Sequence, residues 1–139
     1  NLGILPFWIT LILFPQSNIC RIFITSIFPF LILGGTYIFM LYKSFIGSYD
    51  FIGNFNLYAG IDNLLDLFSD KSFLILFWIH FISINLFVGG WIVKDSQKFR
   101  INKLLLTLPL VTIYLIGPLG LFLYWVIKIF YSKSINLYD

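Results

Sequence analysis

Long apolar stretches alternate with short polar segments along most of the chain. An α-helix needs about 20 apolar residues to cross a hydrocarbon core of roughly 30 Å, and charged residues flank these stretches as they flank membrane-spanning helices. The first stretch, with about thirteen residues, becomes a full span only if residues upstream of Asn1 extend it. The pattern predicts four transmembrane helices, over residues 2–14, 22–42, 73–93 and 104–127.

Proline and glycine interrupt three of these helices. Pro15 is expected to end the first helix and Pro29 to kink the second, because proline lacks a backbone N–H and clashes with the preceding turn. In the fourth helix, the sequence Gly117-Pro118-Leu119-Gly120 predicts a kink or a local unwinding.

The connector between the second and third stretches contains one amphipathic segment. In residues 57–69, apolar side chains recur at helical spacing on one face, and polar side chains occupy the opposite face. This segment is expected to form a short helix that lies at the membrane surface or against the helix bundle. Packing against the bundle or a partner is favoured, because the segment lacks the Lys/Arg face of a helix that binds lipid electrostatically. The predicted fold class is therefore an all-α integral membrane protein, with four transmembrane helices and this surface helix in a single domain of residues 1–139.

The composition also indicates a membrane protein. Of the residues, 60% are hydrophobic, 21% aromatic and 11% charged, whereas soluble domains carry about 25% charged residues. The net charge of +3 does not predict nucleic-acid binding, because the basic residues flank apolar stretches and form no continuous patch. Membrane lipids are the partners that this composition predicts.

The most informative polar residue is His80, the single histidine, which lies inside the third apolar stretch. Polar residues in a transmembrane helix usually face the protein interior, because lipid cannot satisfy their hydrogen bonds. Three interpretations fit His80. It could donate an ordinary interhelical hydrogen bond, it could be the axial ligand of the metal in a bound tetrapyrrole such as chlorophyll, or it could act as a general acid or base.

Other residues extend this candidate site. Several side chains share the His80 face of the helix, and the Gly34–Gly35 pair would let a neighbouring helix or a flat ligand approach the backbone closely. Abundant Phe and Trp suit a carotenoid or a chlorophyll, although they equally suit a lipid-facing surface. The candidate cofactor-binding residues are His80, Ser83, Asn85, Phe87, Trp91, Gly34, Gly35 and Tyr124.

An enzymatic role has a weakness at the sequence level. No acidic residue lies inside any predicted span, and the chain contains no Glu. Asp95 follows the third span, roughly four helical turns from His80, which is too far for the two side chains to act together directly. Acid–base chemistry inside the membrane would therefore rest on His80 alone, and whether the protein is an enzyme stays open.

An ordered set of motifs nevertheless resembles one family. Leu5-Pro6-Phe7-Trp8, Trp78-Ile79-His80, Asn85-Leu86-Phe87-Val88-Gly89 and Gly117-Pro118-Leu119-Gly120-Leu121 occur in the order seen in the abscisic-acid-deficient-four-like, neoxanthin-synthase-like membrane proteins. The resemblance implies a four-helix integral protein of photosynthetic or bacterial membranes with a carotenoid-related role. Plant members of that family are implicated in isomerising violaxanthin to neoxanthin in plastid membranes.

Two positions depart from the family pattern. Asn85 stands where the family has Asp, and Gly90 stands where it has Arg, whereas His80 is kept. Opening an epoxide requires a proton donor at the oxygen and a base at the neighbouring carbon. The loss of one acidic and one basic side chain from the most polar helix therefore weakens the enzymatic interpretation.

Three hypotheses follow for a protein of the thylakoid membrane, in a plastid or a cyanobacterium. The first is a non-catalytic small subunit of a larger photosynthetic membrane complex, such as a photosystem, in contact with carotenoid or chlorophyll. The missing acid and base, the abundant aromatic residues and the single histidine inside a span favour this hypothesis over the other two. The second is a xanthophyll isomerase that converts violaxanthin to neoxanthin, with His80 as its catalytic acid–base group. The third is an assembly or packing subunit without a ligand.

Overall fold

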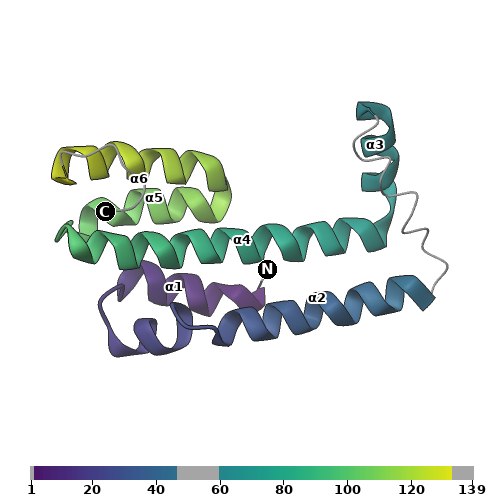
Figure 1. Cartoon of the computed structure of the whole chain (residues 1–139), viewed down its shortest axis with the longest axis horizontal. Coiled ribbons are helices and arrows are strands. Elements are labelled where there is room, and N and C mark those ends of the chain that lie inside the picture. Colours follow the sequence, from purple (N-terminus) through teal and green to yellow (C-terminus); the bar gives the residue numbers. More distant parts are fainter. Residues whose placement is uncertain (1, 47–59, 133–139) are drawn as a thin grey trace. The chain divides into compact units, whose positions relative to one another are not determined.

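The computed structural model describes residues 2–46 and 60–132 of the chain. This part is all-helical, as the sequence pattern predicts (Figure 1). The predicted surface helix corresponds to a helix of residues 61–69, and its first three residues, 57–59, lie outside the described residues. The elements are η1 (Leu2–Ile4), α1 (Leu5–Leu13), the π-helix η2 (Cys20–Ile24), α2 (Phe28–Ile46), α3 (Ile61–Ser69), α4 (Lys71–Lys98), α5 (Lys103–Leu115) and α6 (Gly117–Ser132).

The helices group into two compact units. Of the described residues, unit 1 comprises 2–29 and 84–132, and unit 2 comprises 30–46 and 60–83. Helix α4 contributes its first residues to unit 2 and the remainder to unit 1. The expectation of a single domain stays a prediction.

The prediction of four transmembrane helices is wrong. Among the helices in the described part of the chain, α4 is the one that is long and apolar enough to cross a membrane. It has 28 residues, whereas 13 residues in α5 and 16 in α6 extend only about 20 and 24 Å at 1.5 Å per residue. Both lengths fall short of a hydrocarbon core of roughly 30 Å.

The predicted span over residues 104–127 is two helices because the chain reverses within it. Ile116 has a non-helical backbone (φ −141°, ψ 82°) and separates α5 from α6. Gly117 and Pro118 then begin α6, where proline is tolerated because the first N–H groups of a helix have no partner inside it. The two helices pack side by side and antiparallel (Figure 1), so the interruption is a full turn and not a kink.

The predicted span over residues 22–42 is also divided. The π-helix η2 ends at Ile24, and α2 begins at Phe28, so Pro29 lies in the first turn of a new helix and does not kink a continuous one. The Ser26 hydroxyl oxygen accepts a hydrogen bond from the Phe28 N–H at 3.2 Å, which satisfies one of the free donors at the start of α2.

The core of unit 1 lies where α1, α5 and the C-terminal part of α4 meet. The ring of Trp8 on α1 packs edge-on against Tyr114 on α5, with centroids 5.4 Å apart. Gly89 on α4 leaves the space for the Trp8 ring, because an added Cβ would lie 3.0 Å from it. The buried apolar side chains around this contact include Leu11, Leu86, Ile92, Leu110 and Ile113.

In unit 2, a sharp turn joins α3 to the start of α4. Asp70 has an extended backbone (ψ 121°), and its side chain accepts hydrogen bonds from the N–H groups of Ser72 and Phe73 at 2.6 and 2.9 Å. This is an N-cap, and it explains why α4 begins directly after α3 ends. The Phe68 ring on α3 packs edge-on against Phe77 on α4, with centroids 4.8 Å apart.

Candidate functional site

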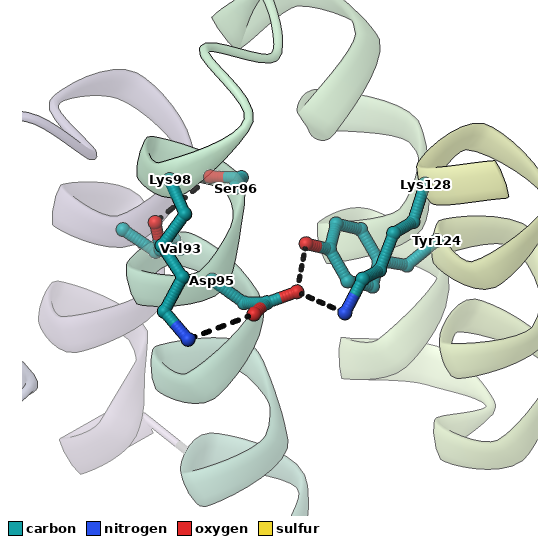
Figure 2. A network of polar contacts seen from close by, with 6 residues as sticks. All are labelled: Val93, Asp95, Ser96, Lys98, Tyr124 and Lys128. Atoms are coloured by element: carbon teal, nitrogen blue, oxygen red, sulfur yellow. Dashed lines mark hydrogen bonds and ion pairs between the residues drawn. The ribbon is translucent and has the colours of Figure 1, made fainter. Parts of the chain in front are cut away.

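A buried polar cluster in unit 1 joins α4 to α6. The Lys128 ammonium lies 3.0 Å from Asp95 Oδ2, and the Tyr124 hydroxyl donates a hydrogen bond to the same oxygen at 2.8 Å (Figure 2). The Lys98 ammonium lies 3.7 Å from the other carboxylate oxygen, Oδ1. Asp95 therefore receives three donors, two of them cationic, and we call Asp95, Tyr124 and Lys128 the polar cluster.

Helical spacing explains why these side chains meet. Trp91 and Asp95 are four residues apart on α4, and Tyr124 and Lys128 are four residues apart on α6, so each pair shares one helix face. The Trp91 ring lies edge-on to the Tyr124 ring, with centroids 5.8 Å apart, and the Lys128 ammonium lies 5.9 Å from the Trp91 centroid. The same ammonium lies 4.9 Å from the Phe99 ring centroid, which adds a second cation–π contact.

Burial determines the electrostatics of the polar cluster. The side chains of Asp95 and Lys128 are 5% and 2% exposed, whereas that of Lys98 is 54% exposed. Burial, the hydrogen bond to Asp95 and the charge of Asp95 raise the pKa of the Tyr124 phenol, which therefore stays protonated and donates. In this closed arrangement the cluster holds α4 against α6 and offers no open position to a substrate.

Unit 2 contains an open pocket between α2 and the first part of α4. Its volume is about 270 Å³, which is slightly below the range of about 300–1,000 Å³ typical of sites that enclose a whole ligand. The pocket can therefore take one end of a long carotenoid, and it is too small to enclose a whole chlorin ring. Its lining residues are Phe30, Leu33, Gly34, Tyr37, Ile38, His80 and Ser83.

Three polar side chains line this otherwise apolar pocket. The Ser83 hydroxyl donates to the Ile79 carbonyl at 2.7 Å, so its proton is already engaged. No hydrogen bond joins the Tyr37 hydroxyl or the His80 imidazole to another residue that the structure describes. Both groups are therefore available to a ligand, and the imidazole can both donate and accept a proton.

The predicted site residues fall into two sets, and their roles stay predictions. His80, Ser83 and Gly34 share the pocket of unit 2, while Gly35 is exposed and does not line it. The other predicted residues belong to unit 1. Asn85 is buried against Gly117, Trp91 packs on Tyr124, Tyr124 belongs to the polar cluster, and Phe87 is 59% exposed.

The described residues contain no group of three or more His, Cys, Asp or Glu side chains that could hold a metal ion. An axial ligand of a tetrapyrrole needs only one such side chain. His80 as a chlorophyll ligand therefore stays a prediction. If His80 did bind the metal of a chlorophyll, most of the chlorin ring would lie outside the pocket, because the pocket volume is only about 270 Å³.

Sequence reasoning missed two members of the polar cluster. Asp95 follows the predicted third span by two residues and Lys128 directly follows the predicted fourth, so both were expected outside the helix bundle, whereas the structure buries both and pairs them. The available signal was the double four-residue spacing, Trp91 to Asp95 and Tyr124 to Lys128, which places one charge and one aromatic ring on a shared face of each helix.

Comparisons with known proteins agree with the motif order in the sequence. The protein ABA DEFICIENT 4, chloroplastic, of Arabidopsis thaliana is 26% identical over 103 residues, which represent 72% of this chain and 46% of that relative. The chain thus spans about half the length of this relative. No solved structure matches the chain significantly. The family model described as ABA DEFICIENT 4-like matches residues 1–124, a region that includes the pocket and most of the polar cluster, and the chain therefore belongs to the ABA DEFICIENT 4-like family.

Proposed function

We propose that this protein binds an epoxy-xanthophyll within a membrane and isomerises it to an allenic xanthophyll, the type of conversion that turns violaxanthin into neoxanthin. The observation that carries the proposal is the family match over residues 1–124, because it includes a pocket with an available histidine. The relative's name describes it as chloroplastic, and we extend that location to this protein as the thylakoid membrane of a plastid or a cyanobacterium.

The chemistry of the conversion is redox-neutral and suits a single acid–base group. A proton leaves the polyene carbon next to the epoxide-bearing ring carbon, and the electron pair of that C–H bond forms a new double bond between the two carbons, which completes the allene. The bond from the ring carbon to the epoxide oxygen breaks with its electron pair on the oxygen, which takes up a proton and becomes a hydroxyl. No oxidant, reductant or other co-reactant is consumed. His80 is the lining group that can move this proton, because its neutral ring accepts one proton and its protonated ring donates one.

Exposed apolar surface supports a membrane environment. Many large apolar side chains are accessible, including Ile38 at 67%, Leu31 at 64% and Phe130 at 78% exposure. Soluble monomers rarely expose apolar patches of more than a few hundred Å². Helix α4 supplies the candidate membrane segment, and lipids are the partners that we propose for the exposed apolar side chains.

A second candidate is a subunit that holds pigment without catalysis, within a larger photosynthetic membrane complex. The observation that favours it is the pocket lining, which contains no carboxylate, lysine or arginine among the described residues. Asp95 and Lys128, which could provide a strong acid–base pair, are both closed to solvent. Under this alternative, carotenoid or chlorophyll would be bound and left unchanged.

Expression in bacterial cells that synthesise violaxanthin separates these candidates. Pigments are extracted and resolved chromatographically, and an allenic product is expected with the unaltered chain. His80→Gln keeps a hydrogen-bonding side chain but cannot transfer the proton, so it should abolish the product while bound pigment remains. Lys94→Gln changes an exposed residue of α4 and is the matched control.

The outcomes lead to different conclusions. Product that is unaffected by His80→Gln would eliminate the proposed role of His80. Violaxanthin that co-purifies with the unaltered chain and is never converted would favour the pigment-holding subunit. A large chlorophyll-bearing assembly isolated from the native membrane would support the photosynthetic-complex version of that alternative.

A further inference from the structure

We propose that the pocket of unit 2 binds the hydroxylated terminal ring of a xanthophyll, and that Tyr37 and His80 together recognise the ring hydroxyl. This inference rests on the proposed function for the class of ligand. It goes further by assigning one end of the ligand to one pocket and by predicting that hydroxylated carotenoids are preferred over hydrocarbon ones.

The size of the pocket selects a ring and not a whole pigment. A volume of about 270 Å³ is enough for a single substituted six-membered ring, and it is below the range of about 300–1,000 Å³ of pockets that enclose a drug-sized ligand. The polyene would therefore leave the pocket and run along apolar surface. Leu31 and Ile32, which neighbour the pocket in sequence on α2, are 64% and 52% exposed and provide such surface.

Gly34 is the position that keeps the pocket open. It lines the pocket, and a Cβ built on it meets no atom within 4 Å. Space next to a glycine inside a helix allows a flat group to lie close to the backbone. A Cβ at residue 34 would enter this space without meeting another atom, and a leucine side chain would occupy more of it.

The polar groups provide the selectivity. In the part of the chain that the structure describes, the Tyr37 hydroxyl and the His80 imidazole have no hydrogen-bonding partner, and they come from the two helices that form the pocket. A ring hydroxyl is both a donor and an acceptor, so it can engage the two groups at once. A hydrocarbon ring would leave both of them unpaired in an apolar site, which lowers affinity.

The test uses zeaxanthin and β-carotene, which share a polyene chain and differ in the ring hydroxyls. Zeaxanthin has no epoxide and cannot undergo the proposed isomerisation, so binding is measured independently of catalysis. The purified full chain in detergent is titrated with each pigment, and the pigment retained per protein after gel filtration is quantified. We expect zeaxanthin to bind about tenfold more tightly than β-carotene, as two modest hydrogen bonds would provide.

Variants then locate the site. Gly34→Leu should reduce zeaxanthin retention at least about tenfold, whereas Thr36→Leu, at an exposed position of the same helix outside the pocket, should leave retention unchanged. The double variant Tyr37→Phe/His80→Leu should retain both pigments equally. Because it adds no bulk to the pocket, it keeps the proposal testable if Gly34→Leu does not fold, as judged by its helical circular dichroism.

Equal retention of both pigments by the unaltered chain would overturn the proposal and identify the pocket as a non-selective apolar surface. An undiminished zeaxanthin preference in the double variant would also overturn it. A different result would show that the proposed isomerase function is wrong while the binding proposal is right. In that case violaxanthin would remain unconverted, and the preference for zeaxanthin and its dependence on Tyr37 and His80 would persist.

Discussion

The Lys128 ammonium lies 3.0 Å from the Asp95 carboxylate, and this ion pair is almost completely removed from solvent. Because removal of one partner leaves the other charge buried, Lys128→Met should lower the free energy of unfolding by about 3–5 kcal/mol. The measurement is denaturant unfolding in a fixed detergent. The double variant Asp95→Asn/Lys128→Met should recover part of this loss, since no net charge then remains in the pair.

Lys98 provides the matched control, because it pairs with the same carboxylate at 3.7 Å but is 54% exposed. Solvent screens an exposed ion pair, so Lys98→Met should cost no more than about 1 kcal/mol. Equal losses from Lys98→Met and Lys128→Met would show that burial does not govern the strength of these contacts.

Tyr124→Phe tests the hydrogen bond of the polar cluster without changing its charge. The Tyr124 hydroxyl donates to Asp95 Oδ2 at 2.8 Å, and the residue is fully buried. Hydrogen bonds to charged groups contribute about 1.5–3 kcal/mol, and the free energy of unfolding should fall by that amount. Tyr131→Phe, at a 44% exposed position of the same helix, is the control and should have little effect. A neutral result at Tyr124 would mean that the two lysines satisfy Asp95 without the phenol.

Gly120→Ala tests the close approach of α5 and α6. A Cβ at Gly120 would overlap the Ile113 side chain and backbone nitrogen, so the helices must move apart. Such overpacking typically costs about 1–3 kcal/mol, measurable as a lower unfolding midpoint. Gly35→Ala on α2 meets no atom within 4 Å, and it should be neutral or gain up to about 1 kcal/mol from the better helix propensity of alanine. Destabilisation by Gly35→Ala, with none by Gly120→Ala, would contradict this packing.

Cys20, the single cysteine, should react at an unusually high pH. It is fully buried, and burial raises the pKa of its thiol from 9.0 to about 11. Because only the thiolate reacts with iodoacetamide, labelling of the folded chain should still increase between about pH 9 and 11, while labelling of the denatured chain levels off near its lower pKa. Mass spectrometry measures both rates. Identical pH profiles would show that the thiol is not buried.

Because the pKa of Cys20 is higher in the folded chain than in the unfolded chain, the stability of the fold depends on pH. The neutral thiol is the form that the folded state favours, so the contribution of Cys20 is complete below the unfolded pKa of 9.0 and is lost as the pH rises towards about 11. The difference in unfolding midpoint between the unaltered chain and Cys20→Ala should therefore shrink over this interval. A difference that is constant from pH 8 to 11 would contradict the shift.

Local chemistry in the sequence predicted the helical class and an irregularity at Pro29 and at Gly117-Pro118, although it predicted kinks or local unwinding there and not separate helices. Pro29 and Gly117-Pro118 both mark helix starts in the structure. What the sequence did not reveal is how far the chain turns at each break, because a kink and a reversal have the same local cause and differ in what the two halves pack against. The antiparallel pair α5 and α6 is stabilised by contacts such as that between Gly120 and Ile113.

For the candidate site too, the sequence predicted individual residues, and only the structure shows which of them lie together. The sequence placed His80 and Ser83 on one face of a helix and Gly34 on another helix. The structure brings these three residues together in one pocket with Tyr37, which was not among the predicted site residues. Gly34 and Gly35 are consecutive residues of α2, and consecutive residues point about 100° apart around a helix axis. Only one of the two glycines therefore faces the pocket. Which glycine does so depends on the rotation of α2 against α4, and that is a tertiary property.

The sequence by itself determined that the protein is apolar and helical, that α4 is long enough to cross a membrane, and that the chain has the motif order of its family. These properties follow from composition, length and neighbouring residues. Only the tertiary structure decided that the other apolar stretches divide into shorter helices and that Asp95 and Lys128 become a buried pair. Burial and ion pairing depend on residues that are distant in the chain, and only helix packing brings such residues within a few ångströms of each other. The sequence pattern near each residue therefore could not reveal them.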